Sequence, residues 1–206
     1  MTDYTVPIKQ VRRILLTLAV LLLPIGGQAQ KFALPSGGYE DGVRVLLLGN
    51  SFTYFHDCDT MLIRIGRSQG VKICIGEYLK GGHTFGQHLN HPASGEAIAA
   101  GNYQAAFIQD FSNNAALYAR DGRKDILRNT RDLKARILQA SPLCRIILER
   151  TWSYSGNGAG GFASEEELDR WLDKGSKAIA RKARLERSPI GEAFNLVRRE
   201  RPDIPL

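Results

Sequence analysis

The sequence contains few of the residues that build disulfide frameworks or metal centres. It has three cysteines, so at least one thiol stays outside any intramolecular disulfide. Cys74 and Cys144 lie in or beside apolar runs, where we expect buried thiols. The four histidines form no His-x-x-x-His pair on a clear helix, and no thiol or acidic ligand lies near His88 and His91. We therefore expect no metal and no other cofactor.

Long apolar runs are also scarce. The run at 14–25 has 12 residues, whereas a membrane-spanning helix needs about 20. Basic residues at 9–13 precede it, and Gly27-Gln28-Ala29 follows as a small-x-small cleavage site. This pattern is typical of an export signal. We expect residues 1–29 to be removed, so that the mature chain begins at Gln30, lies in the periplasm or outside the cell, and has no stable membrane insertion.

No run of charge of one sign dominates the chain, although its formal net charge is +7. The basic residues of 120–136 and 181–201 are interleaved with acidic ones, which is typical of a solvated surface. Because no nucleic-acid motif accompanies them, we expect no nucleic-acid partner. Repeats and low-complexity tracts are also absent, and residues 30–206 have the length of one domain.

The remaining chain alternates between apolar, strand-like runs and amphipathic, helix-like segments. The predicted strands are 43–48, 71–78, 105–109 and 145–149, with a weak fifth around 188–191. The predicted helices are 60–68, 125–140, 164–185 and 192–201, with a helical turn or two at 93–100. This β-α-β alternation predicts an α/β fold with a parallel sheet and right-handed connections.

Ser51 directly follows the first strand, in Gly49-Asn50-Ser51. In an open α/β sheet, ligands bind at the carboxyl ends of the strands, so a serine at this position can be a nucleophile. Asn50 and Ser51 are also good N-cap residues, and Gly49 suits a tight strand-to-helix turn. Taken alone, this segment favours a structural role over catalysis.

Three blocks together resemble the SGNH (GDSL-like) hydrolase superfamily. They are Gly49-Asn50-Ser51, the segment 81–88 after the second strand, and the segment 107–112 at the end of the third. The chain is most similar to a secreted branch, often left as a domain of unknown function, that carries Gly-Asn-Ser-Phe-Thr; Thr151-Trp152 and 189–206 also match it. The resemblance implies a three-layer α/β/α fold with a parallel, flavodoxin-like sheet. It also implies cleavage of small-molecule or glycan esters, such as acyl esters of carbohydrate or of the cell envelope.

The resemblance assigns the site residue by residue. Ser51 would attack the ester carbonyl, while the Ser51 amide, the Gly82 amide and the Gln109 side chain would hold the developing oxyanion. Gln109 stands where the superfamily usually has Asn, a swap that the close branch shares. His83 and His88 have no assigned role in the general pattern, and we expect them to cap or to contact substrate rather than to act as a base.

In the family, an Asp-x-x-His motif and a final helix follow soon after the segment that matches Ile204-Pro205-Leu206, and the motif's His is the catalytic base. The printed sequence ends before that motif. We therefore expect an SGNH-type hydrolase that lacks its last helix and is inactive in this form. A non-catalytic carbohydrate-binding relative is the alternative. A flavodoxin-like nucleotide binder is disfavoured because Gly49 to Thr53 has little glycine and no lysine.

Overall fold

A computed structural model describes residues 42–55, 57–154 and 161–204. The predicted signal segment 1–29 lies outside the described residues, as do most of the glycine-rich stretch 156–161 and residues 205–206. Among the described residues, no helix is both long enough and apolar enough to cross a bilayer.

Five parallel strands in the described part of the chain form one sheet, in the order β2-β1-β3-β4-β5. They are β1 (Val43–Gly49), β2 (Ile73–Leu79), β3 (Ala105–Ile108), β4 (Arg145–Glu149) and β5 (Glu186–Ser188). This is the flavodoxin-like order, which places a crevice at the carboxyl ends of β1 and β3, where the direction of chain winding reverses.

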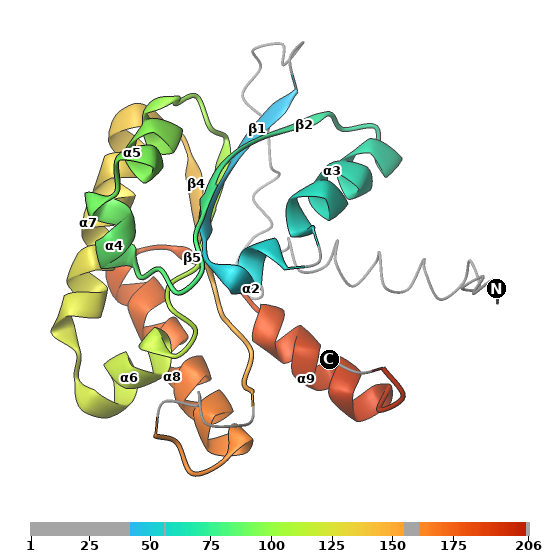
Figure 1. The fold of residues 1–206 in the computed structure, drawn as a ribbon, viewed down its shortest axis with the longest axis vertical. Helices are drawn as coiled ribbons and strands as arrows, with labels where there is room; N and C mark the ends of the chain where they lie inside the picture. Colours follow the sequence, from blue (N-terminus) through green and yellow to red (C-terminus); the bar gives the residue numbers. More distant parts are fainter. Residues whose placement is uncertain (1–41, 56, 155–160, 205–206) are drawn as a thin grey trace, which may run out of the picture. The chain divides into compact units, whose positions relative to one another are not determined.

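Helices lie on both faces of the sheet (Figure 1). One layer contains α4 (Phe85–Asn90), α5 (Pro92–Ala99), α6 (Asn114–Asp121), α7 (Lys124–Ala140) and α8 (Glu165–Ala183). The other contains α3 (Cys58–Ser68) and α9 (Ile190–Glu200), and the short α2 (Ser51–Tyr54) follows β1. The predicted three-layer α/β/α fold with a parallel, flavodoxin-like sheet is confirmed.

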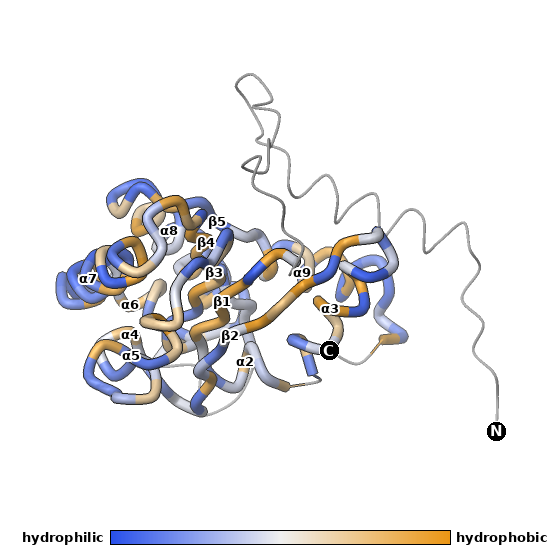
Figure 2. The backbone as a smooth tube through the Cα atoms, turned by 90° about the horizontal axis from the view of Figure 1, so that it is seen from above, coloured by the Kyte–Doolittle hydropathy of each residue, from blue (hydrophilic) through white to orange (hydrophobic). Residues whose placement is uncertain are grey.

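The main core lies between the sheet and the layer that contains α7. Alternate strand residues such as Leu46, Ile108 and Leu148 point into it, because side chains of a strand alternate between the two faces. Leu133 and Ile137 of α7 meet them and are fully buried. Figure 2 shows these hydrophobic strands at the centre and hydrophilic residues along the outside of α7.

Local capping explains where the elements differ from the sequence prediction. The fifth strand is Glu186–Ser188 rather than 188–191, because Pro189 lacks an amide proton and Ile190 already begins α9. Helix α4 replaces a predicted irregular segment: Thr84 and Gln87 form a capping box in which each side chain bonds to the other's backbone. The short helices α2 and α6 were also not predicted.

Two packing predictions fare differently. Cys144 is buried in the main core, as predicted, whereas Cys74 is only half-buried on the edge strand β2. Helix α3 forms as predicted, yet Met61 and Ile65 of its apolar face are 44% and 39% exposed.

Candidate active site

Ser51 is the first residue of α2, immediately beyond the carboxyl end of β1. Asn50 has an extended backbone, and its Oδ1 accepts a hydrogen bond from the amide of Phe52 at 3.2 Å, so it caps the helix. A side chain at position 49 would place its Cβ 2.4 Å from Thr53 Oγ1, which explains why only glycine fits there. The turn therefore presents a half-buried Ser51 at the edge of the sheet.

Asn50 joins the ends of three neighbouring strands. Its Nδ2 donates to the carbonyl of His83 at 3.1 Å and to the carbonyl of Asp110 at 3.2 Å. His83 belongs to the loop after β2, and Asp110 follows β3. Asn50 is only 2% exposed, so these bonds form where water does not compete. The three sequence blocks thus meet at one point, as the parallel sheet predicts.

Gly82 lies in a tight turn beside α2. The amide of His83 donates to the carbonyl of Lys80 at 3.1 Å, and Gly82 has φ +72°, a conformation that favours glycine. A Cβ at Gly81 would lie 3.0 Å from Tyr54 Oη, so the turn approaches α2 closely. Within the described residues, the amides of Ser51 and Gly82 donate to no other group, which leaves both available to a ligand.

Gln109 lies beneath the Ser51 turn and is 1% exposed. Its Oε1 accepts from the Asn50 amide at 3.0 Å and from Thr53 Oγ1 at 3.2 Å. Its Nε2 donates to the carbonyl of Asp110. The carboxamide therefore supports the turn from below. Donation from Gln109 to an oxyanion stays a prediction.

Two carboxyl groups lie at the same edge of the sheet and line a small cavity of about 20 Å³. Burial raises the pKa of Asp110 to about 6, although the amides of Phe85 and Phe111 and the side chain of Asn114 donate to it. Burial also raises the pKa of Glu149, the last residue of β4, to about 7. Glu149 Oε2 lies 3.5 Å from Thr53 Oγ1.

Three histidines, at positions 83, 88 and 91, form a cluster with Tyr78 next to the Gly82 turn. The His83 and His88 rings are 5.4 Å apart, and the His91 ring stacks on Tyr78 at 4.6 Å. His88 is fully buried, its Nδ1 lies 3.4 Å from Ser94 Oγ, and burial lowers its pKa to about 4. In the described part of the chain, no group of histidine, cysteine or acidic residues has the arrangement of a metal site.

Aromatic rings pack around Phe52, the residue that follows Ser51. Phe52 stacks on Trp152 with ring centroids 4.4 Å apart, and Trp152 stacks on Phe194 of α9 at 4.0 Å. Tyr154 meets Phe52 edge-on at 5.8 Å. This aromatic stack links the residue after Ser51 to the last described helix.

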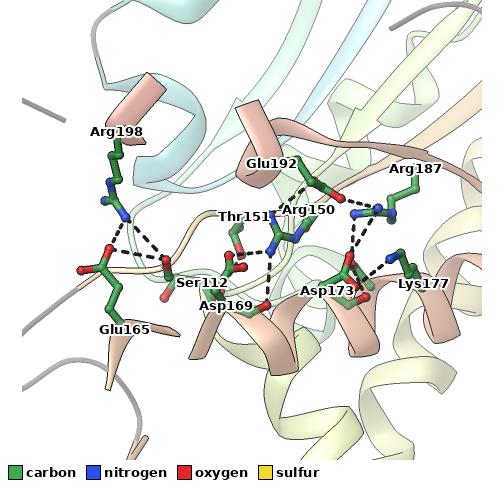
Figure 3. Close-up of polar contacts among 12 residues, drawn as sticks. Ser112, Arg150, Thr151, Glu165, Asp169, Asp173, Lys177, Arg187, Glu192 and Arg198 are labelled. Atoms are coloured by element: carbon green, nitrogen blue, oxygen red, sulfur yellow. Dashed lines mark hydrogen bonds and ion pairs between the residues drawn. The ribbon is translucent and has the colours of Figure 1, made fainter. Parts of the chain in front are cut away.

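A network of charged residues holds α9 where it can form that stack (Figure 3). Arg150 is 1% exposed and lies between Asp169 of α8 and Glu192 of α9. Further along, Arg198 of α9 pairs with Glu165 at the start of α8. Position 191 favours glycine, because a Cβ there would lie 2.5 Å from the backbone carbonyl oxygen of Thr151 and 2.1 Å from Arg150 Nη1.

Sequence reasoning did not single out Thr53, Asp110, Glu149 or Arg150. A detectable signal did exist for Glu149, because an acidic residue that ends a buried apolar strand occurs at the edge where ligands bind. The contacts of Thr53 and Arg150 depend on residues far along the chain, so no local pattern indicates them.

The arrangement offers a hydroxyl beside two unoccupied backbone donors, which is what attack on a carbonyl requires. A base must also take the hydroxyl proton. Within residues 42–55, 57–154 and 161–204, no side chain accepts a hydrogen bond from Ser51 Oγ.

No protein-family model and no curated protein matches the sequence. Solved structures do match the fold. An SGNH hydrolase from Slackia heliotrinireducens superposes with a TM-score of 0.58 at 17% identity, over 75% of this chain and 83% of that one. A GDSL-like lipase from Parabacteroides merdae ATCC 43184 gives 0.56 at 12% identity, over 78% and 83%. An acetyl xylan esterase gives 0.56 at 10% identity, over 78% and 84%.

These neighbours define the class of fold: the chain has the three-layer fold of the SGNH and GDSL-like hydrolases. This confirms the fold that the three sequence blocks imply.

Proposed function

We propose that the protein is an exported serine ester hydrolase of the SGNH type, acting on acyl esters of carbohydrate or of cell-envelope glycans. The observation that supports it most is the convergence at Asn50. That side chain links the Ser51 turn to the loops that carry Gly82 and Gln109. A mere helix cap would not require bonds to two other strand-end loops.

In this proposal, Ser51 Oγ attacks the ester carbonyl carbon and forms a tetrahedral intermediate. The unoccupied amides of Ser51 and Gly82 donate to its oxyanion. The third donor is the second hydrogen of Gln109 Nε2, whose first hydrogen bonds to the Asp110 carbonyl. Each well-aimed donor contributes about 10²–10³ in rate. The intermediate then expels the alcohol, and water hydrolyses the acyl-enzyme.

The proton acceptor belongs to the Asp-x-x-His motif that the family resemblance places after the segment ending at Leu206. Its histidine would take the Ser51 proton during attack and return it to the leaving alcohol. We therefore expect hydrolysis from a chain in which this motif follows residue 206.

The proposed substrate class rests on three observations. The export-type N-terminus directs the protein toward the envelope or beyond, where glycan esters occur. One structural neighbour is described as an acetyl xylan esterase. Tyr54 and Phe111, 38% and 36% exposed, lie in segments that adjoin Ser51 and offer apolar surface for an acyl group.

One observation favours the alternative, a non-catalytic carbohydrate-binding protein. No described residue accepts the Ser51 proton, and a serine without an adjacent base is a weak nucleophile. Under this alternative, the aromatic stack and the Gly82 turn bind sugar without cleavage.

Hydrolysis of 4-nitrophenyl acetate separates the two. A polypeptide of residues 1–206 fused to a family-like tail with Asp-x-x-His should exceed residues 1–206 alone in kcat/KM by several orders of magnitude, because a triad without its base retains only about 10³–10⁴ over water. In the extended protein, Ser51→Ala should abolish the gain, and Gln109→Ala should lower it about 10²–10³-fold.

Ser112→Ala in the extended protein serves as a control, because Ser112 lies after β3 and bonds to Tyr154 rather than to the Ser51 turn. If the folded, extended protein is inactive on simple esters, or if Ser51→Ala leaves the rate unchanged, the binding alternative replaces the hydrolase.

A further inference from the structure

A cavity of about 260 Å³ lies at the edge of the sheet opposite Ser51. Its walls are the amino ends of β4 and β5 and the carboxyl ends of α7 and α8. Because the strands are parallel, their carboxyl ends and the Ser51 turn lie at the other edge. The cavity is slightly smaller than the range of about 300–1,000 Å³ that is usual for ligand pockets, so it suits a small molecule.

Four charged side chains line this cavity, and they do not balance. Arg145 and Glu186 form a pair, with Arg145 Nε 2.7 Å from Glu186 Oε1. The other two are Lys134 and Arg184, and in the described part of the chain neither forms an ion pair. The cavity therefore retains two positive charges that no described carboxylate neutralises.

Lys134 of α7 covers the carboxyl end of α8. Its Nζ donates to the carbonyls of Ala183 at 2.9 Å and Arg184 at 3.0 Å, and the carbonyl of Lys182 accepts from Arg131 at 3.0 Å. Carbonyls at the end of a helix repel an anion, but these already have donors. An ammonium group has three N–H donors, so Lys134 has one left for a ligand.

Arg184 stands where the backbone favours a different residue. It is the C-cap of α8 with φ 54°, the left-handed conformation that glycine adopts most readily. Its side chain is exposed and hydrogen-bonds to none of the described residues. The local structure therefore gives no reason for arginine at this position. A planar fork of N–H donors beside a cavity is suited to a carboxylate or a phosphate.

We propose that this cavity binds a small organic anion. Arg184 and the third N–H of Lys134 hold its carboxylate or phosphate group, while Leu138, Ile146 and Leu185 contact a compact apolar body. A neutral ligand would leave both positive charges unpaired. An inorganic ion would leave the apolar walls without a partner. The site lies apart from the proposed ester hydrolase and does not depend on it.

Isothermal titration calorimetry of the full chain tests the ligand class. The probes are phenyl phosphate and benzoate, which join one apolar ring to two different acid groups, with inorganic phosphate and benzyl alcohol as controls. We expect saturable one-to-one binding of at least one aromatic anion, and the comparison distinguishes phosphate from carboxylate. Absence of such binding at millimolar concentration would overturn the proposal, as would equally tight binding of inorganic phosphate or benzyl alcohol.

Arg184→Gln should weaken that binding at least about tenfold, the loss expected for one charge-assisted hydrogen bond. Arg181→Gln is the matched control: it removes the same charge from an exposed position near the end of α8 that does not line the cavity. It should change the affinity by no more than about twofold, because salt screens an exposed charge. Equal losses in the two variants would mean general attraction to a basic surface and would refute the site.

Arg184→Gly separates binding from folding. Glycine relieves the left-handed backbone, so this variant should melt at a higher temperature than wild type and yet bind the anion as weakly as Arg184→Gln. Retained affinity in Arg184→Gly would show that the arginine side chain does not hold the ligand.

Nitrogen-15 NMR locates the bound anion. The amide signals of Cys144 and Glu186 should move on titration, and those of Ser51 and Gly82 should not. Movement of the Ser51 and Gly82 signals alone would place the anion at the ester site and overturn the proposal. Because binding is the readout, a protein without hydrolytic activity counts against the proposed hydrolase and leaves this test intact.

Discussion

At the scale of single residues, Asn50 carries the most structural weight in the site. Both of its side-chain ends are used: Oδ1 caps α2, and Nδ2 bonds to the carbonyls of His83 and Asp110. An amide is the only side chain of this size that can accept at one end and donate twice at the other. The identity of residue 50 therefore determines how the three loops meet.

Asn50→Asp should destabilise the protein by about 2–4 kcal/mol, since it retains the cap but turns an oxygen toward two buried carbonyls. Urea unfolding measures the change. Asn90→Asp is the matched control, because Asn90 is exposed and bonds to a single carbonyl, that of Gly86. Equal losses in the two variants would show that Asn50 does not connect the loops.

His88 gives a pH-dependent prediction at the same scale. Burial lowers its pKa from 6.5 to about 4. As the pH falls, the His88 ring therefore takes up a proton in the unfolded chain before it does so in the folded chain. The stability that neutral His88 contributes is therefore present above pH 6.5 and is lost as pH falls toward 4. The loss amounts to about 3 kcal/mol at 1.36 kcal/mol per unit.

Burial raises the pKa values of Asp110 and Glu149, whereas it lowers that of His88. The dependence of wild-type stability on pH therefore does not isolate His88. The useful quantity is the difference in unfolding free energy between wild type and His88→Asn at each pH. It should shrink by about 3 kcal/mol from pH 7 to pH 4. A difference that stays constant with pH would mean that His88 is not held neutral.

At the scale of elements, α9 is attached largely through charge. Its apolar side chains are only half-buried, and Gly191 is its one buried residue. Arg150, by contrast, is almost fully enclosed between α8 and α9. Removal of one partner from such a buried pair leaves the other charges uncompensated, which is far more costly than loss of an exposed pair.

Arg150→Ala should therefore lower the free energy of unfolding by about 3–5 kcal/mol and release α9. Because Phe194 of α9 stacks on Trp152, near-ultraviolet circular dichroism should report the release. Arg199→Ala, on the same helix as Phe194 and 71% exposed in its side chain, should change stability by no more than about 1 kcal/mol. If the two variants behave alike, packing rather than charge holds α9.

The sequence predicted the long elements because their patterns are local. Helix 125–140 shows its apolar period over several turns, and β1 and β4 each contain a continuous apolar stretch of three or more residues, Val45–Leu48 and Ile146–Leu148. The short α4 depends instead on one capping box at Thr84, and the register of β5 depends on pairing with β4. Such elements require contacts that a periodic pattern does not encode.

At the scale of the whole molecule, the convergence of the three sequence blocks at one edge of the sheet was predictable, and the contacts beneath Ser51 were not. Parallel strands end at one edge, so Ser51, Gly82 and Gln109 were expected to converge there. The contacts of Thr53 with Gln109 and Glu149 join residues from three separate regions, and they depend on which way each side chain points. That information becomes available only when the fold is assembled.

The central claim is that Ser51 is a nucleophile, and covalent capture tests it most directly. A fluorophosphonate probe should add one phosphonyl group to the protein extended with Asp-x-x-His, and peptide mass spectrometry should place it on Ser51, with no addition to Ser51→Ala and normal addition to Ser112→Ala. A label on another residue, or equal labelling of Ser51→Ala, would contradict the account.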